Sequence, residues 1–430
     1  MKKNKLNIAI VGLGNIGSYL YKYLQENKKI LSKKNNCIPE VIYVSAKNRN
    51  KKRNVKISKK KWLKNFLDST ISKDVDIIVE LIGGAEGAAK KLVFNALKNK
   101  KHVVTANKAL IAKYGDQLSK IAEKNKVNLE FEAAVCGGVP IIRSLKEGLI
   151  ANKISRVYGI FNGTSNYILS NMDKDRKTFN DVLNDAKDKG YAESNPISDL
   201  NGDDVASKLK ILSSLCFNSF INHNIHVEGI NFIDSFDIDN ANKLGYKIKL
   251  LGVSEVINNK VYQRVHPTLI KQSSYIASID GVLNAVIVDG KPVGENVIQG
   301  EGAGPEATTS ALISDISSIL RGNIKFPFSI SSKERKNLNY SNISERIFSA
   351  YLRFEVIDKP GVLSKITNIF SKNKVSIKRL IQNPNRSKKF SSIIIITHNS
   401  KDKSLIKILK QTEKKPYITK KPKLIRIGTN

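Results

Sequence analysis

The sequence predicts an α/β protein with three units: a doubly wound parallel sheet at the N-terminus, an α+β domain in the middle and a compact βαββαβ unit at the C-terminus. Short β-rich runs alternate with helix-like stretches near the N-terminus, longer strand-like segments follow, and a new strand and helix pattern begins near residue 350. Alternating strands and helices are typical of parallel sheets covered by helices. At about 150 residues per domain, the 430 residues accommodate roughly two to four domains. We expect domains at 1–145, 146–305 and 349–430, a helix that returns to the first domain at 306–322, and a linker at 323–348.

The first predicted element is a strand at 6–11 (LNIAIV), followed by a glycine turn and a helix-like segment. The turn consists of Gly12, Leu13, Gly14, Asn15, Ile16 and Gly17. In this arrangement the first glycine makes a tight turn, the second lets the backbone approach a pyrophosphate, and the third allows the helix to pack closely on the strand. The helix N-terminus then faces the phosphate charge. The pattern predicts a Rossmann-type dinucleotide site; a glycine turn that binds no dinucleotide is the alternative.

The second predicted strand, 40–46, ends without an acid. NAD-specific sites usually carry an acid there, which holds the ribose 2′-hydroxyl. Lys47 and Arg49 follow instead, so we expect them to bind a 2′-phosphate and to favour NADP(H) over NAD(H). Alternatively, both cations belong only to the general lysine excess of the chain. Further strands are predicted at 75–81, 102–105 and 128–133.

The chain carries 73 Lys and Arg against 38 Asp and Glu, which gives a formal net charge of +35. A basic surface is common in proteins that bind nucleic acid. The most basic segment, 47–64, has no acid, but Trp62 is its only aromatic residue, so a base-stacking platform is missing. We expect a solvated lysine-rich surface and no nucleic-acid partner. The alternative predicts binding to nucleic acid that weakens steeply with salt.

Cysteine usage and hydropathy favour a cytoplasmic protein. Cys37, Cys136 and Cys216 are far apart in the sequence, which suits reduced thiols better than a disulfide or zinc framework. The longest strongly apolar runs are of strand length, well below the ~20 residues that cross a bilayer. The histidines show no zinc-ligand spacing. We therefore expect neither a membrane partner nor a transition metal.

In the middle of the chain, the predicted strands are longer and helices lie between them. These strands are at 154–161, 225–233, 261–265 and 276–288. Turn-rich motifs occur at Asn162-Gly163-Thr164 and at 300–304 (GEGAG). The sequence of 306–320 predicts a helix, and that of 321–348 predicts a polar linker.

The segment 190–212 (GYAESNPISDLNGDDVASKLKIL) contains the strongest candidates for catalysis. Asp204 and Lys208 are four residues apart, so they share one face of a predicted helix. Glu193 and Asp199 lie just upstream. Three carboxylates and one ammonium group can therefore meet around a small polar substrate that carries an amino group. An Asp and Lys pair at this spacing is also an ordinary surface ion pair, which is the alternative.

A second candidate is Lys108, which follows the predicted strand 102–105 in the motif Thr105-Ala106-Asn107-Lys108. Open α/β sheets bind ligands at the carboxyl ends of their strands. Lys108 is thus placed to reach a nicotinamide, and the alternative is a surface lysine at the start of a helix.

Together these motifs resemble the homoserine dehydrogenase family, in its monofunctional form with a C-terminal ACT domain. The matching pieces span nearly the whole chain: IAIVGLGNIG, VELIGG, VVTANK, EAAVCGGVPI, GIFNGTSNYIL, GYAE, DLNGDDVASKLKIL and GEGAG. The resemblance implies reversible hydride transfer between NAD(P)H and L-aspartate 4-semialdehyde, which gives L-homoserine for threonine, methionine and isoleucine biosynthesis. The first domain is then the NAD(P)-binding domain, and the second binds substrate, carries catalysis and dimerises.

The resemblance also implies roles for individual residues. Lys208 matches the family's proposed acid/base, and Lys108 matches a lysine assigned to the cofactor or to catalysis. The residues expected to hold substrate are Glu193, Asp199, Asp204 and Thr164. Gly190 and Gly302 are expected to touch the cofactor. A structural Na⁺ is expected on backbone carbonyls of Glu132, Val135, Gly137 and Val139.

Residues 350–430 resemble an ACT domain, whose turn, here Asp358-Lys359-Pro360-Gly361, commonly borders an amino-acid site between paired domains. We expect threonine as effector and a homodimer or homotetramer; a dimerisation module without a ligand is the alternative. Truncation near Ser349 is then expected to remove inhibition and leave catalysis. Lysines near the C-terminus predict a solvated basic strand edge, so pairing with a second copy is expected to use the strands 351–357 and 391–397.

Two other functions are less consistent with the residues. A catalytically silent amino-acid sensor would lack the lysines at 108 and 208, and both are present. A dehydrogenase that forms an acyl intermediate needs a nucleophilic cysteine with an activating base, and Cys136 has no such neighbour in the sequence.

Overall fold

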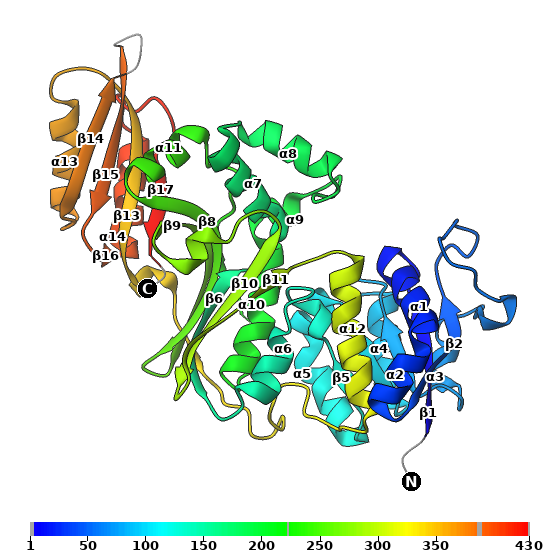
Figure 1. Cartoon of the computed structure of the whole chain (residues 1–430). Helices are drawn as coiled ribbons and strands as arrows, with labels where there is room; N and C mark the ends of the chain where they lie inside the picture. The colour runs from blue at the N-terminus through cyan, green and yellow to red at the C-terminus, as the bar shows by residue number, and fades with distance from the viewer. Residues whose placement is uncertain (1–3, 222, 385–388, 429–430) are drawn as a thin grey trace.

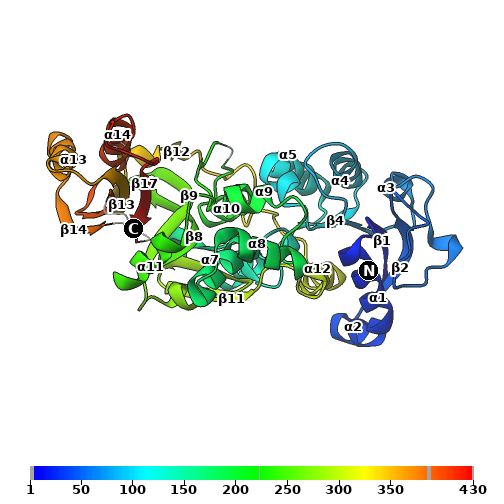
Figure 2. The same ribbon diagram turned by 90° about the horizontal axis from the view of Figure 1, so that it is seen from above.

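The structure is a computed structural model that describes residues 4–221, 223–384 and 389–428. Its three units lie in a row, with the N-terminal domain at one end and the C-terminal unit at the other (Figure 1 and Figure 2). The predicted fold class is confirmed: a five-stranded parallel sheet is followed by a mixed sheet and a βαββαβ unit. Within the described ranges, no helix combines the length and the hydropathy that a membrane span requires.

The N-terminal sheet has the strand order β2 (Ile38–Ser45), β1 (Lys5–Val11), β3 (Ile77–Glu80), β4 (His102–Thr105) and β5 (Leu129–Glu130). Both faces are buried, because Ile8 and Ile10 of β1 point to one side while Ala9 and Val11 point to the other. The first side is covered by α1 (Asn15–Glu26), α2 (Lys28–Asn35) and α12 (Pro305–Leu320). The second side is covered by α4 (Ala88–Lys98) and α5 (Lys108–Asn125); α3 (Asp68–Ile71) precedes β3. The strand order reverses between β1 and β3, which is where such sheets bind ligands.

The middle domain builds an antiparallel sheet in the order β11 (Gly294–Glu301), β10 (Leu283–Lys291), β6 (Lys153–Ile160), β8 (Tyr246–Ile257) and β9 (Lys260–Lys271). Its helices are α6 (Ile141–Arg143), α7 (Gly163–Asp175), α8 (Phe179–Asp188), α9 (Ile197–Asn201), α10 (Asp203–Cys216) and α11 (Ser235–Lys243). Val205 and Leu209 of α10 are completely buried in the same core as Val265 of β9. Helix α12 then leaves this domain and packs its Leu312 and Ile316 into the N-terminal core.

Several strands differ from the sequence prediction. The sequence indicates only 261–265, whereas the structure has a long hairpin of β8 and β9. Asn258 and Asn259 connect the two strands, and both have positive φ angles, 49° and 61°. This is the backbone of a type I′ turn, which Asn tolerates better than most residues. Strand β11 was also missing from the prediction.

Three predicted strands are shorter than expected. Of 225–233, only β7 (His226–Val227) is a strand, because Gly229 turns the chain against the backbone of Leu200 and Asn201. The predicted strand 276–288 begins as a 3₁₀ turn, η4 (Tyr275–Ser278), and only the part from Leu283 belongs to a strand, because the chain turns at Gly281, which has a φ of 66°. After Glu130, the predicted strand 128–133 becomes a 3₁₀ turn, η2 (Glu132–Ala134).

The segment predicted as a polar linker, 321–348, is anchored rather than loose. Phe328 is buried, and its ring lies 5.2 Å from that of Phe131 and 5.7 Å from that of Phe220. The Arg335 guanidinium contacts the carboxylates of Asp116 and Glu123 at 2.8 and 3.0 Å. The segment also forms β12 (Asn339–Tyr340), which pairs with β9, and the turn η5 (Ile343–Glu345). The segment therefore lies along the outer side of α5 and extends to the middle sheet.

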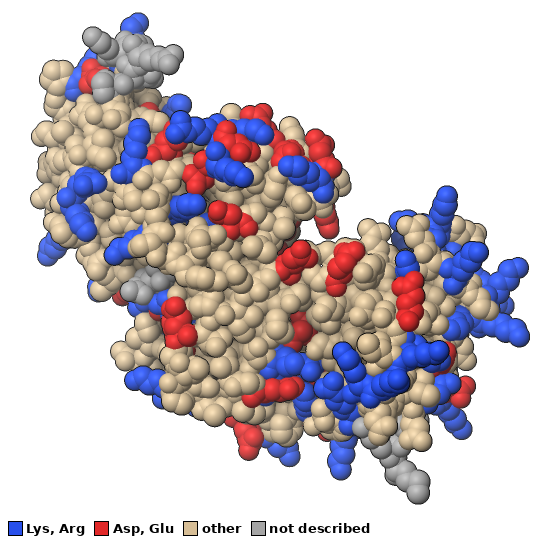
Figure 3. All heavy atoms as spheres, viewed as in Figure 1, with Lys and Arg blue, Asp and Glu red and all other residues tan. Residues whose placement is uncertain are grey.

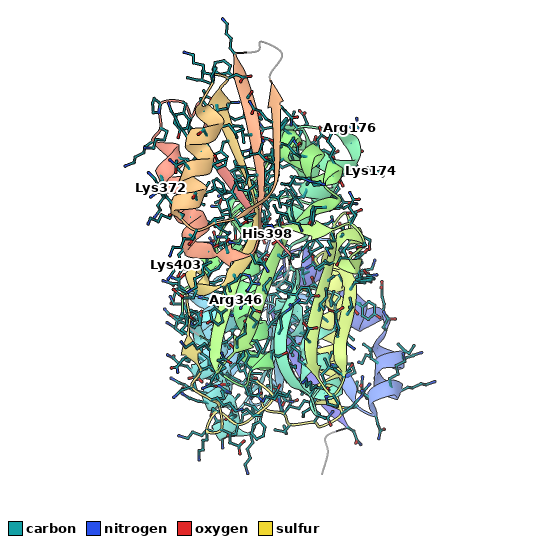
Figure 4. The ribbon with its side chains drawn as sticks, turned by 90° about the vertical axis from the view of Figure 1, so that its left-hand side faces the viewer. Lys174, Arg176, Arg346, Lys372, His398 and Lys403 are labelled. Carbon is teal, nitrogen blue, oxygen red and sulfur yellow. The ribbon has the colours of Figure 1, made fainter. Side chains whose placement is uncertain are left out.

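The C-terminal unit follows the predicted βαββαβ order. Its elements are β13 (Ile347–Ile357), α13 (Val362–Lys372), β14 (Ile377–Pro384), β15 (Phe390–Thr397), the short β16 (Ser400–Lys401), α14 (Asp402–Glu413) and β17 (Lys423–Ile427). Strand β17 pairs with β13 and, in parallel, with β9, where Arg426 lies opposite Thr268. The middle and C-terminal sheets are therefore one continuous sheet. In Figure 4, Arg346 is labelled below Lys403 and His398, near this junction.

This pairing corrects the expectation for the C-terminal edge. Strand β17 is not a solvated edge, because Arg426 is fully buried and Lys423 contacts Asp234 and Asp237 at 2.6 and 2.8 Å. The strands proposed for pairing with a second copy, β13 and β15, lie inside the sheet with a neighbour on each side. The open edges of the continuous sheet are β11 and β14.

Candidate active site

Asp204 lies at the centre of a cluster of charged side chains between the N-terminal and middle domains. Its Oδ1 is 2.8 Å from Nζ of Lys108, and its Oδ2 is 2.8 Å from Nζ of Lys208. The Asp204 side chain is 5% exposed, whereas that of Lys108 is 42% exposed. The structure thus joins two lysines that lie 100 residues apart in the sequence through one buried carboxylate.

The first turns of α10 place Asp204 and Lys208 on one side of the helix. Gly202 ends α9 and precedes α10 with a φ of 88°, a conformation that suits glycine. A Cβ at this position would lie 3.0 Å from the Val227 side chain, so the joint between the two helices is also tightly packed. One turn later, Nζ of Lys208 donates to the carbonyl of Phe161 at 2.6 Å, which fixes its direction.

Lys108 is held at the start of α5 by its neighbour Asn107. The Oδ1 of Asn107 accepts a hydrogen bond from the backbone N–H of Leu110 at 3.1 Å and so caps the helix. Its Nδ2 donates to the carbonyl of Gly84 at 2.7 Å, in the segment that follows β3. Lys108 therefore projects from the carboxyl end of β4, as the sequence predicts.

Asp199 and Thr164 are close to the cluster. Nδ2 of Asn162 donates to Oδ1 of Asp199 at 2.7 Å and to Oδ2 of Asp204 at 2.9 Å. Thr164 lies in the first turn of α7, where its hydroxyl donates to the carbonyl of Tyr191 at 2.7 Å. Glu193 is exposed and makes no recorded contact with these side chains. Gly190 lies just after α8, with a φ of 74°.

Burial and charge act on these groups in opposite directions. Burial disfavours the ionised Asp204, but the ammonium groups of Lys208 and Lys108 outweigh it and hold the pKa of Asp204 well below its usual range. Burial likewise disfavours the charged Lys208, but the Asp204 carboxylate raises the pKa of Lys208 above its ordinary value. Burial raises the pKa of Asp199, and the charge of Asp204 raises it further. The cluster thus contains a strongly ionised pair and a carboxyl group that protonates more readily.

The glycine turn after β1 opens onto a cavity of about 340 Å³. A Cβ on Gly12 would lie 2.4 Å from the carbonyl oxygen of Leu81, and a Cβ on Gly17 would lie 2.0 Å from that of Gly12, so neither position has room for a side chain. At Gly14, by contrast, a Cβ would meet nothing within 4 Å. The backbone there is accessible at the N-terminus of α1, as pyrophosphate binding requires.

Cations line the same cavity, but they are not the two that the sequence suggested. Lys51, Lys52 and Arg53 line it together with Gly14 and Asn15. Arg53 is fixed there, because its Nε donates to the carbonyl of Leu13 at 3.0 Å and its terminal nitrogens donate to the carbonyls of Asn48, Arg49 and Lys51. Arg49 and Arg53 both lie over the Trp62 ring, 5.4 and 5.3 Å from its centroid, but Arg49 does not line the cavity, and Lys47 is exposed. On the face shown in Figure 3, Lys and Arg also gather over the N-terminal domain.

The turn at 132–139 packs against the GEGAG turn near the cluster. The backbone N–H of Gly138 donates to the carbonyl of Glu301 at 2.9 Å. A Cβ on Gly302 would collide with the Asn284 side chain, which donates to the same Phe161 carbonyl as Lys208. The Glu132 carboxylate accepts from two N–H groups at the start of α6, yet burial raises its pKa to about 7.

A separate cavity of about 320 Å³ lies in the C-terminal unit. Its lining includes the turn 358–361, Leu363 and Gln382. Oδ2 of Asp358 accepts a hydrogen bond from the Ser391 hydroxyl at 2.8 Å. The cavity therefore lies at the turn before α13 where the sequence predicts an effector site.

Comparison with known proteins covers the whole chain. Residues 12–132 match the model of the homoserine dehydrogenase NAD-binding domain, 140–317 match homoserine dehydrogenase, and 350–416 match the ACT domain. A homoserine dehydrogenase of Neisseria gonorrhoeae is 38% identical over 98% of both chains. One from Helicobacter pylori is 39% identical over 99% of both chains. The chain belongs to the homoserine dehydrogenase family.

A solved structure supports this assignment. The crystal structure of a homoserine dehydrogenase from Thiobacillus denitrificans has a TM-score of 0.91 and 35% identity, with 99% of each chain covered. As a homoserine dehydrogenase, the chain is an NAD(P)-dependent oxidoreductase that acts on a CH–OH group and interconverts L-homoserine and L-aspartate 4-semialdehyde. The N-terminal sheet is its nicotinamide nucleotide-binding domain, and the C-terminal unit is an ACT domain.

The sequence did not single out two features of this homoserine dehydrogenase. Asn162 was noted only as part of a turn, because its partners Asp199 and Asp204 are 37 and 42 residues away. Its position before Gly-Thr-Ser does signal a helix cap. Arg53 lies within a lysine-rich run, and nothing in the sequence indicates that Arg53, and not Lys47 or Arg49, lies beside the glycine turn.

Proposed function

We propose that Lys208 is the acid/base of the reaction, that Lys108 assists it beside the substrate carbonyl, and that Asp204 holds both. The observation that carries this proposal is the pair of 2.8 Å contacts from one buried carboxylate to two ammonium groups. These groups stand at the carboxyl end of β4, and ligands bind at that edge in open α/β sheets.

The chemistry follows from charge. The bound nicotinamide supplies or accepts the hydride. Reduction leaves negative charge on the carbonyl oxygen of the substrate, which a positioned ammonium group stabilises before it donates a proton. The raised pKa of Lys208 keeps its Nζ protonated for this step. In the oxidation direction the same Nζ must first lose a proton, so oxidation of homoserine is favoured as the pH rises.

Carboxylates near the lysines suit the amino group of the substrate. Asp199 lies beside Asp204, and Thr164 is in the adjoining turn of α7. Glu193 is exposed on the segment that leads into α9. In this assignment Glu193 pairs with the α-ammonium group of the substrate, and Asp199, Asp204 and Thr164 support its binding.

For the cofactor, the assignment is NADP(H) in preference to NAD(H). Gly12, Gly14, Asn15, Ile16 and Gly17 form the pyrophosphate turn, and Gly190 and Gly302 are assigned to the nicotinamide end. The cations Lys51, Lys52 and Arg53 support a 2′-phosphate, because they line the cavity beside this turn. Lys47 and Arg49, assigned from the sequence, remain alternatives for the same contact.

Initial rates of L-homoserine oxidation with NADP⁺ and NAD⁺ test this assignment. We expect a higher kcat/KM with NADP⁺. Lys52→Ala is expected to lower kcat/KM for NADP⁺ at least about tenfold and to change that for NAD⁺ little, because Lys52 lines the cavity and charge-assisted hydrogen bonds to phosphate are strong. Arg49→Ala is the matched variant: a selective loss there and none in Lys52→Ala would place the phosphate at Arg49.

The turn at 132–139 is the assigned site of a structural Na⁺. Cys136 and Gly137 both have positive φ angles, which turn successive carbonyls to different sides. Among the residues described, the carbonyls of Val135 and Gly137 accept no recorded backbone hydrogen bond, and no cluster of acidic, His and Cys side chains forms a metal site. Carbonyl donors from Glu132, Val135, Gly137 and Val139 suit a hard cation. Na⁺ is expected to raise Tm more than K⁺ at equal ionic strength.

The ACT domain is assigned to regulation by an amino acid, with threonine as the first candidate. The Asp358 carboxylate at the cavity supplies the negative charge that an amino group requires. ACT sites commonly form between paired domains, so this assignment includes a homodimer or homotetramer, which sedimentation equilibrium tests. The proposal includes a place in threonine, methionine and isoleucine biosynthesis. It also includes a cytoplasmic location, which is supported by the three cysteines, because all of them are buried and no disulfide joins them.

A further inference from the structure

Asn162 occupies an unusual position between two carboxylates of the candidate active site. Its Nδ2 donates to Asp199 at 2.7 Å and to Asp204 at 2.9 Å, so both N–H bonds of one amide are directed at acids. Its Oδ1 accepts the backbone N–H of Ser165 at 2.7 Å and caps α7. Asn162 is 5% exposed, so water has little access to this bridge.

The orientation of the amide is determined by its partners. A backbone N–H can only be satisfied by the oxygen, and ionised carboxylates can only be satisfied by the NH₂ group. Reversing the amide would place its oxygen against two acids and its NH₂ against a donor. Asparagine therefore fits this position with one orientation, and neither Asp nor Ser supplies the same set of bonds.

The bridge matters because the two acids have different environments. Asp204 contacts both Lys108 and Lys208, whereas the side chain of Asp199 accepts a hydrogen bond from Asn162 and forms no ion pair with the described residues. Burial and the Asp204 charge raise the pKa of Asp199. The Asn162 N–H favours the ionised form of Asp199 and opposes this effect. Without the bridge, the two carboxylates would repel each other and Asp199 would protonate at higher pH.

We propose that Asn162 is a positioning residue of the reaction, which holds the carboxylate of Asp199 at a fixed place beside the pair of Asp204 and Lys208. This inference rests on the roles proposed above for Asp199 and Asp204. Asn162 fixes where the substrate amino group is held relative to the proton-donating Nζ of Lys208. It does so through the acids and does not itself touch the reacting atoms.

The charges facing the bridge are balanced. Two carboxylates, Asp199 and Asp204, face two ammonium groups, Lys108 from α5 and Lys208 from α10. Cys136 faces the same group from the 132–139 turn, but burial raises the pKa of its thiol to about 11, so it is neutral. An aspartate at position 162 would add a third negative charge and remove both donated hydrogen bonds. It would keep the helix cap, because Asp and Asn cap equally well.

The test compares Asn162→Asp with Asn35→Asp. Asn35 is equally buried, at 3% exposed, and uses its amide in the same way: Nδ2 donates to Leu31 and Ser317, and Oδ1 accepts from Arg321. It lies on α2, outside the candidate active site. We expect Asn162→Asp to lower kcat/KM for homoserine at least about tenfold. We also expect the acidic limb of its pH profile to move up by about one pH unit or more. Asn35→Asp is expected to leave kcat/KM and the acidic limb of the pH profile unchanged, once the rate is divided by the concentration of folded protein.

Asn162→Ser is the second variant, because it keeps a helix cap, adds no charge and removes the bridge. It is expected to raise KM for homoserine and to move the acidic limb upward less than Asn162→Asp does. If Asn162→Asp does not fold, this variant alone decides. An unchanged pH profile and an unchanged KM in the folded variants would overturn the inference. Asp204→Asn separates the proposed function from this inference. If Asp204→Asn keeps full activity, the proposed function is wrong. If Asp204→Asn loses activity and the Asn162 variants keep full activity, only this inference is wrong.

Discussion

At the scale of single residues, Asp204 sets the protonation of the lysine on which the reaction is proposed to depend. Burial alone lowers the pKa of Lys208, and the Asp204 carboxylate reverses that effect. The carboxylate remains ionised because two ammonium groups stabilise it. The Asp204 side chain therefore determines how readily Lys208 loses its proton, and neutralising Asp204 changes the pKa of Lys208.

Asp204→Asn tests this dependence. With the countercharge removed, burial dominates and the pKa of Lys208 falls. Protonated Lys208 is the proposed acid in the reduction of the semialdehyde, so the rate of the variant is expected to decline at lower pH than that of the wild type. Loss of acid/base alignment is expected to lower kcat by about 10² or more. A pH profile of the reduction with an unmoved alkaline limb would contradict the account.

Sequence reasoning found part of this site. The i, i+4 spacing predicted that Asp204 and Lys208 would meet, and the strand end predicted that Lys108 would face a ligand. It could not predict that Asp204 contacts both lysines, because Lys108 and Asp204 lie on separate domains and their distance depends on how α5 packs against α10. The positions of Asn162 and Arg53 depend on tertiary contacts in the same way.

At the scale of elements, the joint between α9 and α10 positions the acids of the site. Gly202 adopts a φ of 88° between the two helices, and Gly229 of the neighbouring segment packs directly on the backbone of Leu200 and Asn201. Asp199 precedes this joint and Asp204 follows it. The relative position of the two carboxylates therefore depends on a backbone conformation that only glycine adopts without strain.

Gly202→Ala is expected to destabilise the protein by about 1 to 3 kcal/mol, through the positive φ and the close Val227 contact. It is also expected to lower kcat, because Asp199 and Asp204 shift relative to each other. Gly148→Ala is the matched control, since its φ is not positive and a Cβ there meets nothing within 4 Å. Urea unfolding and steady-state rates measure both effects. Equal stability of the two variants would show that the joint is not strained.

Element prediction succeeded where periodicity and turn signals agreed. The glycine turn, the short parallel strands and the helix 306–320 all follow from local sequence. The hairpin of β8 and β9 is only partly predicted, because Asn258-Asn259 is a weaker signal for a type I′ turn than the usual Asn-Gly or Asp-Gly. The strand expected at 225–233 was shortened by a tertiary contact of Gly229, which no local pattern reveals.

At the scale of the whole molecule, the ACT domain is joined to the catalytic domain by a continuous sheet and by buried ion pairs. The fully buried Arg426 of β17 contacts Asp402 at 2.7 Å and Glu228 at 2.8 Å. Burial opposes ionisation of Glu228, but hydrogen bonding with His226 and the Arg426 charge lower its pKa to about 2. The stabilisation from this depressed pKa is present above the ordinary value of 4.5 and is lost as the pH falls from there towards 2.

This interface changes the expected result of truncation at Ser349. Removing β17 opens the edge of β9 and leaves Glu228 without Arg426. We therefore expect the truncated protein to have a lower Tm and to aggregate, in addition to losing inhibition. Differential scanning calorimetry of the truncated and full chains measures this loss, and equal Tm values would contradict it.

Asp358→Ala tests regulation with the sheet intact. Loss of the carboxylate is expected to weaken inhibition by threonine about tenfold or more and to leave uninhibited kcat unchanged. The turn precedes α13 in the C-terminal unit, whereas the lysines lie between the other two domains, and Asp358 takes no part in the junction. Titration of activity with threonine at matched protein concentrations measures the effect. Unchanged inhibition would place the effector site elsewhere.

The central claim is that Lys208 is the acid/base of the reaction, and the kcat of Lys208→Ala tests it most directly. Lys210→Ala is the control, because Lys210 lies on the same helix and has no recorded contact with Asp204. Homoserine oxidation by Lys208→Ala is expected to fall by about 10² to 10⁴, while Lys210→Ala keeps the wild-type rate. A kcat for Lys208→Ala close to that of the wild type, in a folded protein that still binds cofactor, would contradict the account.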